Sequence, residues 1–213
     1  MFGLDKNIKC VVFDFDGTLV DSNHIKRDGF YAVTQDIPGS HKVLDNIFNG
    51  PSPGDRHAIF KTFTEYLGLA KEEGLTLTER YSQYCFEEIM NCNYMKGAKT
   101  ALNTLFDLNI NMFMNSATPQ NALKTVVDAM ELSPYFRGVY GGPIAKEKNL
   151  LSILNSEQVR PCNTVVVGDG QDDADSAIKT GCNFVPVFEA RSVKDGGDKL
   201  DDLAQLPALL SLA

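Results

Sequence analysis

The sequence lacks the features that would attach this protein to a membrane or to nucleic acid. No apolar run among its 213 residues is long enough to cross a bilayer, and residues 1–9 have neither the basic start nor the apolar stretch of a signal peptide. Positive charge is scarce, since 20 lysines and arginines face 28 acidic residues, for a net charge of −8. Nucleic acid and anionic membranes therefore find no counter-charge on this protein. We expect a cytoplasmic protein.

Paired cysteines are also missing. The five cysteines form an odd, scattered set with no Cys-x-x-Cys pair, and the three histidines share no ligand-like spacing with them. We therefore expect reduced structural thiols and no zinc site. The remaining composition, with 43% apolar and 23% charged residues, is typical of a globular protein. A chain of this length forms one large domain, or a core with one insertion.

Two carboxylates follow the first apolar run of the chain. Residues 8–13 are nearly all apolar and rich in β-branched side chains, which predicts a strand buried on both faces of a parallel sheet. Asp14 and Asp16 come next, and in extended backbone they project to the same side. Gly17 then allows a sharp turn, which we expect to leave backbone N–H groups free to face an anion. Two acids this close need a cation between them or a retained proton, although an Asp-x-Asp pair also occurs in calcium-like loops and solvated turns.

The whole string from Asp14 to Ser22, Asp-Phe-Asp-Gly-Thr-Leu-Val-Asp-Ser, resembles the first signature of the haloacid dehalogenase superfamily. The resemblance implies an aspartate-nucleophile phosphohydrolase, in which Asp14 is the nucleophile and Asp16 is the general acid. The branch of the superfamily that cleaves carbon–halogen bonds has no acid at the second position. Asp16 therefore favours phosphoryl transfer.

After this string the pattern becomes helical for roughly 70 residues, which is too long for a loop. Four helices are predicted: one capped by Ser22 and broken at Pro38, then residues 41–48, residues 55–68, and residues 79–90 capped by Thr78. This segment predicts an all-helical insertion.

The rest of the chain alternates strand and helix, which predicts a parallel sheet with helices on both faces. The predicted strands are residues 8–13, 110–114, 138–140, 164–167 and 183–188; the predicted helices are 98–108, 119–130, 147–155, 174–180 and 203–212. The expected fold is therefore α/β, a Rossmann-like three-layer core formed by residues 1–20 and 95–213, with a helical cap at 21–94. Ligands bind such sheets at the carboxyl ends of the strands.

Ser116 follows the second predicted strand as the hydroxyl-bearing motif of the family does. The resemblance implies that Ser116, its neighbour Ala117 and Thr18 hold phosphoryl oxygens. The alternative is that Ser116 caps the helix that follows, and the two roles are compatible. The family's lysine matches Lys146, with Lys148 as the competing position, and either could be a solvated helix-start lysine. Lys146 is preferred because Leu150 lies four residues on, although Glu147 stands where the family has proline.

The run Gly-Asp-Gly-Gln-Asp-Asp at 168–173 matches the fourth signature of the family. The resemblance implies that Asp169 binds a metal together with Asp14 and the backbone carbonyl of Asp16. Asp173 would then act through water or orient Lys146, and Asp172 is interpreted as a helix-start charge. Oxygen ligands with retained waters and a phosphate oxygen favour Mg²⁺ over Ca²⁺.

The position of the insertion resembles the phosphoglycolate phosphatase and β-phosphoglucomutase group, which implies a small phosphorylated metabolite as substrate. Arg56 is the predicted substrate contact of the cap, with an exposed helix-start arginine as the alternative. A phosphomutase is the closest rival function, but Lys26 stands where that group tends to carry histidine, with His24 nearby. A phosphonate-cleaving enzyme would need a cap lysine where this chain has Asp55 and Arg56, and a non-catalytic binding protein would have lost a core residue.

Overall fold

The computed structural model describes residues 7–51, 54–188, 190 and 199–211. It divides the chain into two compact units. The core unit comprises Met1–Asp21 with Cys92–Ala213, and the helical unit comprises Ser22–Asn91. No helix within the described part of the chain is long and apolar enough to span a bilayer.

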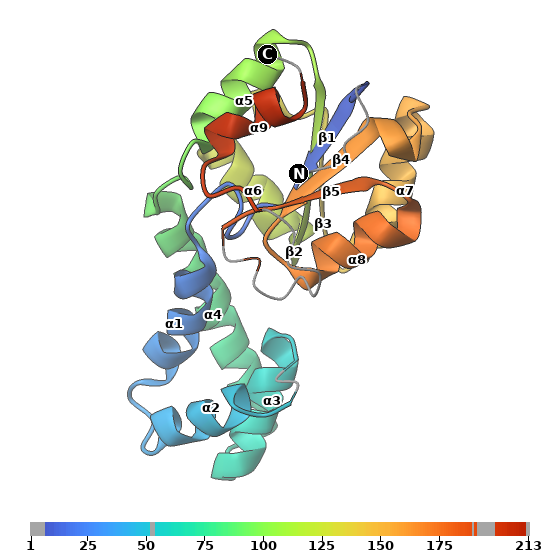
Figure 1. Cartoon of the computed structure of the whole chain (residues 1–213). Coiled ribbons are helices and arrows are strands. Elements are labelled where there is room, and N and C mark those ends of the chain that lie inside the picture. The colour runs from blue at the N-terminus through green and yellow to red at the C-terminus, as the bar shows by residue number, and fades with distance from the viewer. Residues whose placement is uncertain (1–6, 52–53, 189, 191–198, 212–213) are drawn as a thin grey trace. The chain divides into compact units, whose positions relative to one another are not determined.

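The core unit is built on a five-stranded, all-parallel sheet in the order β3-β2-β1-β4-β5 (Figure 1). The strands are β1 Cys10–Phe13, β2 Asn111–Pro119, β3 Gly138–Gly142, β4 Thr164–Gly168 and β5 Asn183–Pro186. β1 lies at the centre, pairs with β2 on one side and β4 on the other, and is buried throughout. Its run of apolar residues suits a strand with no solvent-facing side.

Helices cover both faces of this sheet. The helices α5 (Ala98–Asp107) and α6 (Gln120–Ala129) lie on one face, and α7 (Lys146–Glu157) and α8 (Gln171–Thr180) lie on the other (Figure 1). Apolar side chains of α7 and α8, among them Ile153 and Ala177, form one buried cluster with Val12 of β1 and Val166 of β4. The predicted three-layer α/β core is therefore confirmed.

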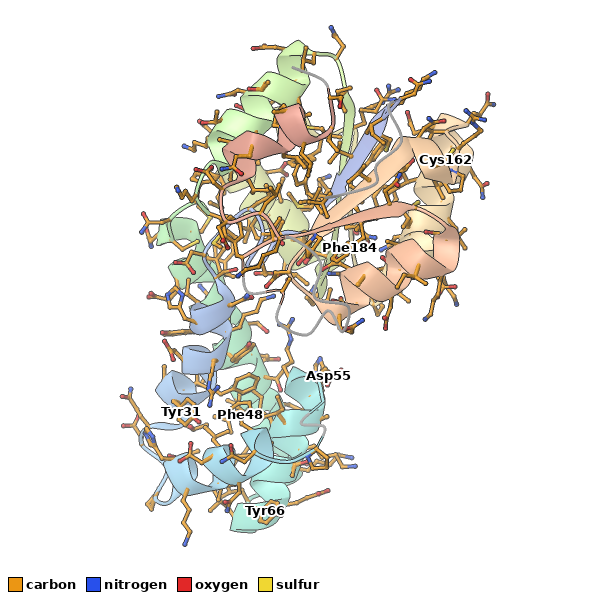
Figure 2. The ribbon with its side chains drawn as sticks, viewed as in Figure 1. Tyr31, Phe48, Asp55, Tyr66, Cys162 and Phe184 are labelled. Carbon is orange, nitrogen blue, oxygen red and sulfur yellow. The ribbon has the colours of Figure 1, made fainter. Side chains whose placement is uncertain are left out.

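The helical unit contains α1 (Asn23–Thr34), α2 (Ser40–Phe48), α3 (Arg56–Leu67) and α4 (Lys71–Asn91). Aromatic rings fill its centre: the ring of Phe30 lies 4.3 Å from that of Tyr81 and 5.2 Å from that of Phe60, measured between centroids. At its margin Tyr31 packs near Phe48, as Figure 2 shows. The unit therefore has a hydrophobic core of its own.

The fourth helix begins earlier than predicted. α4 starts at Lys71, and Thr78, the predicted cap, lies inside it and donates its hydroxyl to the carbonyl of Gly74 at 2.8 Å. Gly74 made a start before Thr78 improbable on propensity alone. At Gly74 the helix packs against α3, where an added Cβ would lie 3.5 Å from the Thr64 side chain, an ordinary contact. Tertiary packing overrides the local preference.

Several other expected boundaries also shift. β2 runs on to Pro119, β5 stops at Pro186, and Ser22 occupies the cap position of α1 without a side-chain capping bond. The predicted C-terminal helix is a 3-10 turn, Leu203–Gln205, followed by α9 (Leu206–Leu209), while residue 212 lies outside the described residues. Leu203 and Leu206 are fully buried, so this segment packs on the core.

Candidate active site

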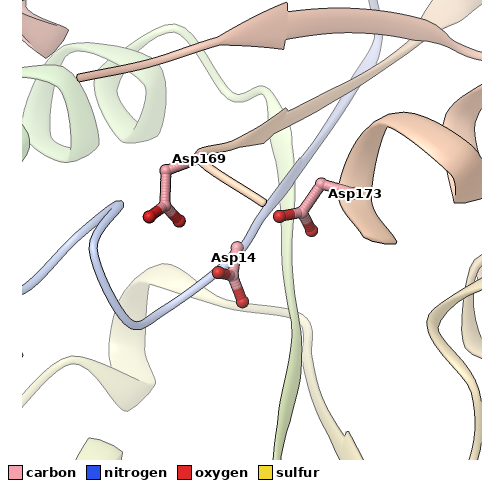
Figure 3. Close-up of side chains that lie close together, drawn as sticks. All are labelled: Asp14, Asp169 and Asp173. Carbon is pink, nitrogen blue, oxygen red and sulfur yellow. The ribbon is translucent and has the colours of Figure 1, made fainter. Parts of the chain in front are cut away.

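Three carboxylates meet at the carboxyl edge of the sheet. Asp14 follows β1, Asp169 follows β4, and Asp173 lies in the first turn of α8. Each offers an oxygen within 4.8 Å of the other two, and Figure 3 shows all three side chains facing one small space. Asp14 and Asp173 are buried, with 6% and 1% of their surface exposed. The central strand and its neighbour thus bring together acids that lie far apart in the sequence.

One buried lysine is bound to this acidic cluster. Lys146 is the first residue of α7, and its Nζ lies 3.0 Å from Oδ1 of Asp14 and 2.8 Å from Oδ1 of Asp173. Asp172 adds a third carboxylate, with its Oδ2 at 3.0 Å from the same nitrogen. Lys148, the competing candidate, is exposed. Of the two lysines, the structure brings Lys146 to the acids.

Burial controls the charges in this cluster. The pKa of Asp14 is raised to about 6, mainly because burial disfavours the charged carboxylate; Lys146 opposes the rise and the nearby Asp16 adds to it. Burial also raises the pKa of Asp173 well above its usual value, helped by Asp14. For Lys146 burial lowers the pKa, but the carboxylates of Asp14, Asp173 and Asp172 outweigh it and the net shift is upward. The ammonium stays charged among more acids than it can neutralise, so the cluster suits a hard divalent cation.

The Asp16 side chain is hydrogen-bonded to residues of β2. Its Oδ2 accepts a hydrogen bond from Thr118 Oγ1 at 2.7 Å and a longer one from Ser116 Oγ at 3.4 Å. Ser116 Oγ in turn accepts from the backbone N–H of Thr118 at 3.1 Å. Asp16 is buried, with 6% of its surface exposed. The second acid of the pair is therefore held by hydroxyl groups.

Two expectations for this edge were wrong. Ser116 does not cap a helix, because it lies within β2 and α6 begins only at Gln120. The pairing of β2 with β3 shifts between Asn115 and Pro119, and such a bulge re-aims the side chains within it. The turn after Asp16 does not leave its amides free: Gly17, at φ +75°, donates to the carbonyl of Val20 at 2.8 Å, and Thr18 donates to that of Phe15.

Thr18 is fully buried, and its hydroxyl donates to Oδ1 of Asp169 at 3.2 Å. A hydroxyl has one proton to donate, so this contact positions the Asp169 carboxylate. Phosphate binding by Thr18 remains a prediction. Ala117 is exposed in the bulge of β2.

Sequence reasoning missed residues that support the site. Asp172 was interpreted as a helix-start charge, and Thr118 was not singled out. A buried amide relay was also missed: Asn149 donates to Asn115 at 3.0 Å, and Asn115 donates to the backbone carbonyl of Lys146 at 2.9 Å. Burying an amide side chain in the apolar strand β2 costs free energy unless the amide is hydrogen-bonded. Asn115 was therefore the one residue of this relay whose role the sequence could have indicated.

A cavity of about 340 Å³ borders the cluster on its lysine side. Ala117, Lys146 and Asp172 line it together with residues of α7, α8 and the loop before α7, whereas Asp14, Asp16 and Ser116 do not. The acids that meet at the strand tips therefore lie beside this cavity and outside its lining.

Arg56 lies in the helical unit as the first residue of α3. It is half-buried; its Nη1 donates to Ser82 Oγ at 3.2 Å, and its guanidinium lies 5.6 Å from the centroid of the Tyr81 ring. The side chain is therefore held in place within its own unit, and its predicted contact with substrate remains a prediction.

Comparison with known proteins gives a consistent result. Residues 8–181 match the family model of haloacid dehalogenase-like hydrolases. The chain is 22% identical to a phosphoglycolate phosphatase of Vibrio parahaemolyticus over 83% of this chain and 82% of that protein. The fold resembles a predicted phosphoglycolate phosphatase from Haemophilus somnus, with a TM-score of 0.77, 18% identity and coverage of 97% and 99% of the two chains. It also resembles β-phosphoglucomutase from Clostridium difficile, with a TM-score of 0.69, 18% identity and 93% of each chain covered.

Proposed function

Because this chain belongs to the haloacid dehalogenase-like hydrolases, we propose that it hydrolyses phosphate monoesters of small metabolites through a covalent bond to Asp14. The observation that carries the proposal is the buried cluster at the strand tips, in which the Asp14 carboxylate lies 3.0 Å from the Lys146 ammonium and close to Asp169 and Asp173. A phosphate ester repels nucleophiles by its own charge, so a site must neutralise its oxygens and aim the attacking group. A carboxylate beside a buried cation meets both needs.

In the first step an oxygen of Asp14 attacks phosphorus, and the bond between phosphorus and the substrate's alcohol oxygen breaks. Asp16 gives its carboxyl proton to that departing oxygen. The Asp16 carboxylate then takes a proton from a water molecule, whose oxygen attacks phosphorus and releases Asp14 with inorganic phosphate. Lys146 keeps the Asp14 carboxylate oriented throughout and offsets negative charge on the transferring group.

Magnesium is the proposed cofactor. Asp14, Asp169 and the backbone carbonyl of Asp16 would hold the ion. The carboxylate of Asp173 lies close to those of Asp14 and Asp169 and would act through water or through Lys146. The donor set consists of hard oxygen atoms, as Mg²⁺ requires. When bound, the ion offsets the repulsion between the acids and polarises a phosphoryl oxygen.

Ser116, Ala117 and Lys146 are the proposed phosphate-binding residues. The Ser116 hydroxyl lies at the strand edge beside Asp16, and the bulge of β2 brings Ala117 to the surface next to it. Thr18 supports the site by holding Asp169.

The proposed substrates are phosphoglycolate-like acids and sugar phosphates. Two of the similar proteins bear the name phosphoglycolate phosphatase. Arg56 is the proposed cap contact for the end of the substrate that does not react. Its guanidinium is held by Ser82 and Tyr81, and a fixed guanidinium matches the planar geometry of a carboxylate.

A phosphomutase is the second candidate, favoured by the structural similarity to β-phosphoglucomutase. It would pass the phosphoryl group from Asp14 to a second hydroxyl and release no inorganic phosphate. Incubation with a sugar 1-phosphate and its bisphosphate separates the two functions, because only a mutase yields an isomer without net release of phosphate.

The proposal is tested by turnover of para-nitrophenyl phosphate with Mg²⁺ and with EDTA. We expect Mg²⁺-dependent release of phosphate that Asp14→Asn abolishes. Asp36→Asn, which changes an exposed aspartate of the helical unit, serves as the matched control and should keep wild-type turnover. Turnover that persists in Asp14→Asn contradicts the nucleophile assignment, and a wild-type protein inactive on a panel of phosphorylated metabolites favours a binding protein.

A further inference from the structure

We propose that Thr118 positions the general acid of this site. The inference rests on the proposed function, because it concerns the Asp16 carboxyl in its role as proton donor. Thr118 Oγ1 lies 2.7 Å from Oδ2 of Asp16, which is within the usual range of an O–H···O hydrogen bond. Hydrogen bonds to an ionised carboxylate are among the stronger ones in proteins.

Ser116 cannot take over this task during the reaction. Its hydroxyl lies 3.4 Å from the same Oδ2, and its oxygen already accepts from the backbone N–H of Thr118. A serine has one proton to donate, and in the proposed function that proton goes to a phosphoryl oxygen of the bound substrate. Of the two hydroxyl groups, only that of Thr118 then still holds the Asp16 carboxyl in place.

The contact also favours one oxygen as the site of the proton. The carbonyl oxygen of a neutral carboxyl group is its better acceptor, so the hydrogen bond at Oδ2 favours the proton on Oδ1. The proton is therefore presented on the oxygen away from Thr118, and the departing alcohol oxygen receives it there. Once the proton has left, Thr118 stabilises the carboxylate that remains.

The backbone around Thr118 is closely packed, as a positioning residue requires. A Cβ added at Gly141 of β3 would lie 2.6 Å from the carbonyl oxygen of Thr118, and one added at Gly142 would lie 2.9 Å from that of Ala117. Only glycine permits β3 to approach the bulge of β2 so closely. The bulge is thereby held against its neighbour, with the Thr118 hydroxyl directed at Asp16.

The test compares two substrates that differ in their need for a proton. The nitrophenolate released from para-nitrophenyl phosphate leaves readily without protonation, whereas the alkoxide released from glycerol phosphate does not. The quantity measured is kcat/KM, which includes departure of the alcohol and excludes the later attack by water. The variants are Thr118→Val, which removes the hydroxyl at nearly constant shape, Thr118→Ser, which keeps it, and Thr118→Ala as a second deletion.

General acid catalysis contributes about 10²–10⁴-fold, and we expect Thr118→Val to lose roughly 10- to 100-fold in kcat/KM on glycerol phosphate. The loss on para-nitrophenyl phosphate should be about threefold or less by the same reasoning, and Thr118→Ser should restore most of the rate. Thr125→Val, which removes an exposed hydroxyl bonded to a backbone carbonyl of α6, should behave as wild type.

Equal losses on both esters in Thr118→Val and Thr118→Ala would mean that Thr118 is structural or binds substrate, and the inference would be overturned while the proposed function stands. A failure of Thr118→Ser to restore the rate would overturn it as well. If wild-type protein cleaves neither ester, the proposed function and the inference fall together.

Discussion

Lys146 is a single buried cation shared by several carboxylates. Its Nζ contacts Asp14, Asp172 and Asp173 within 3.0 Å, and 7% of its side chain is exposed. Removing one partner of a buried ion pair is costly because the charge left behind has lost both its water and its counter-charge. The stability of the core unit and the chemistry of the site thus depend on the same nitrogen.

We therefore predict that Lys146→Met lowers the free energy of unfolding by roughly 3 kcal/mol in EDTA at pH 7. Lys148→Met is the matched control on the same helix, and because its side chain is exposed the change should stay within about 0.5 kcal/mol. Urea denaturation of both variants measures the difference. Equal effects of the two substitutions would contradict the assignment of the ion pairs.

The residues found from the sequence are those whose chemistry is visible locally. Asp14, Asp16 and Asp169 follow apolar strands, and the parallel sheet brings strand ends together whatever the loops do. Thr118 and Asp172 were missed because their roles depend on geometry that no local pattern encodes. The role of Thr118 depends on the bulge in β2, and the role of Asp172 depends on the position of Lys146 at the start of α7.

Strand β1 carries a thiol at its buried start. Cys10 is fully buried, and burial raises the pKa of its thiol from 9.0 to about 12, with Glu157 and Cys182 adding to the rise. The folded protein therefore prefers the protonated thiol more strongly than the unfolded chain does. This contribution to stability is complete below pH 9 and is lost as the pH rises toward 12.

We predict that wild type loses about 2 kcal/mol more stability between pH 8 and about pH 10.5 than Cys10→Ala does, since each pKa unit is worth about 1.4 kcal/mol. Urea unfolding at the two pH values measures this difference, and Cys162→Ala controls for loss of a thiol. Parallel pH profiles of wild type and Cys10→Ala would mean that the thiol does not titrate differently on folding.

At the level of elements, the predicted fold was confirmed because buried parallel strands and amphipathic helices have distinct periods. The predicted bounds are wrong where packing between elements determines how far a helix or strand extends. α4 continues through Gly74 while it packs against α3, and β2 continues through the bulge because Gly141 and Gly142 let β3 follow it closely. Neither the packing of α3 against α4 nor that of β3 against β2 can be predicted from the residues of α4 or β2 alone.

Considered as a whole, the molecule has two units, each with buried apolar residues of its own. All the proposed metal ligands lie in the core unit. The net charge of −8, by contrast, is a property of the entire chain and does not distinguish the two units. A ligand that binds only the folded form stabilises what it binds by RT ln(1 + [L]/Kd). Metal binding should therefore raise the stability of the core unit more than that of the helical unit.

The chain contains no tryptophan, so a single introduced tryptophan can report on each unit separately. We predict that Mg²⁺ at a hundred times its Kd, worth about 2.7 kcal/mol, raises the melting midpoint of Tyr135→Trp in the core unit by about 5 to 10 °C relative to EDTA. Tyr66→Trp, which replaces an exposed ring of the helical unit, should show a smaller shift. Asp169→Asn added to the core reporter should abolish the shift, and Asp36→Asn should preserve it. A midpoint that Mg²⁺ leaves unchanged in the core reporter would rule out a metal at the strand tips, because no ion can bind there selectively without stabilising the fold that assembles its ligands.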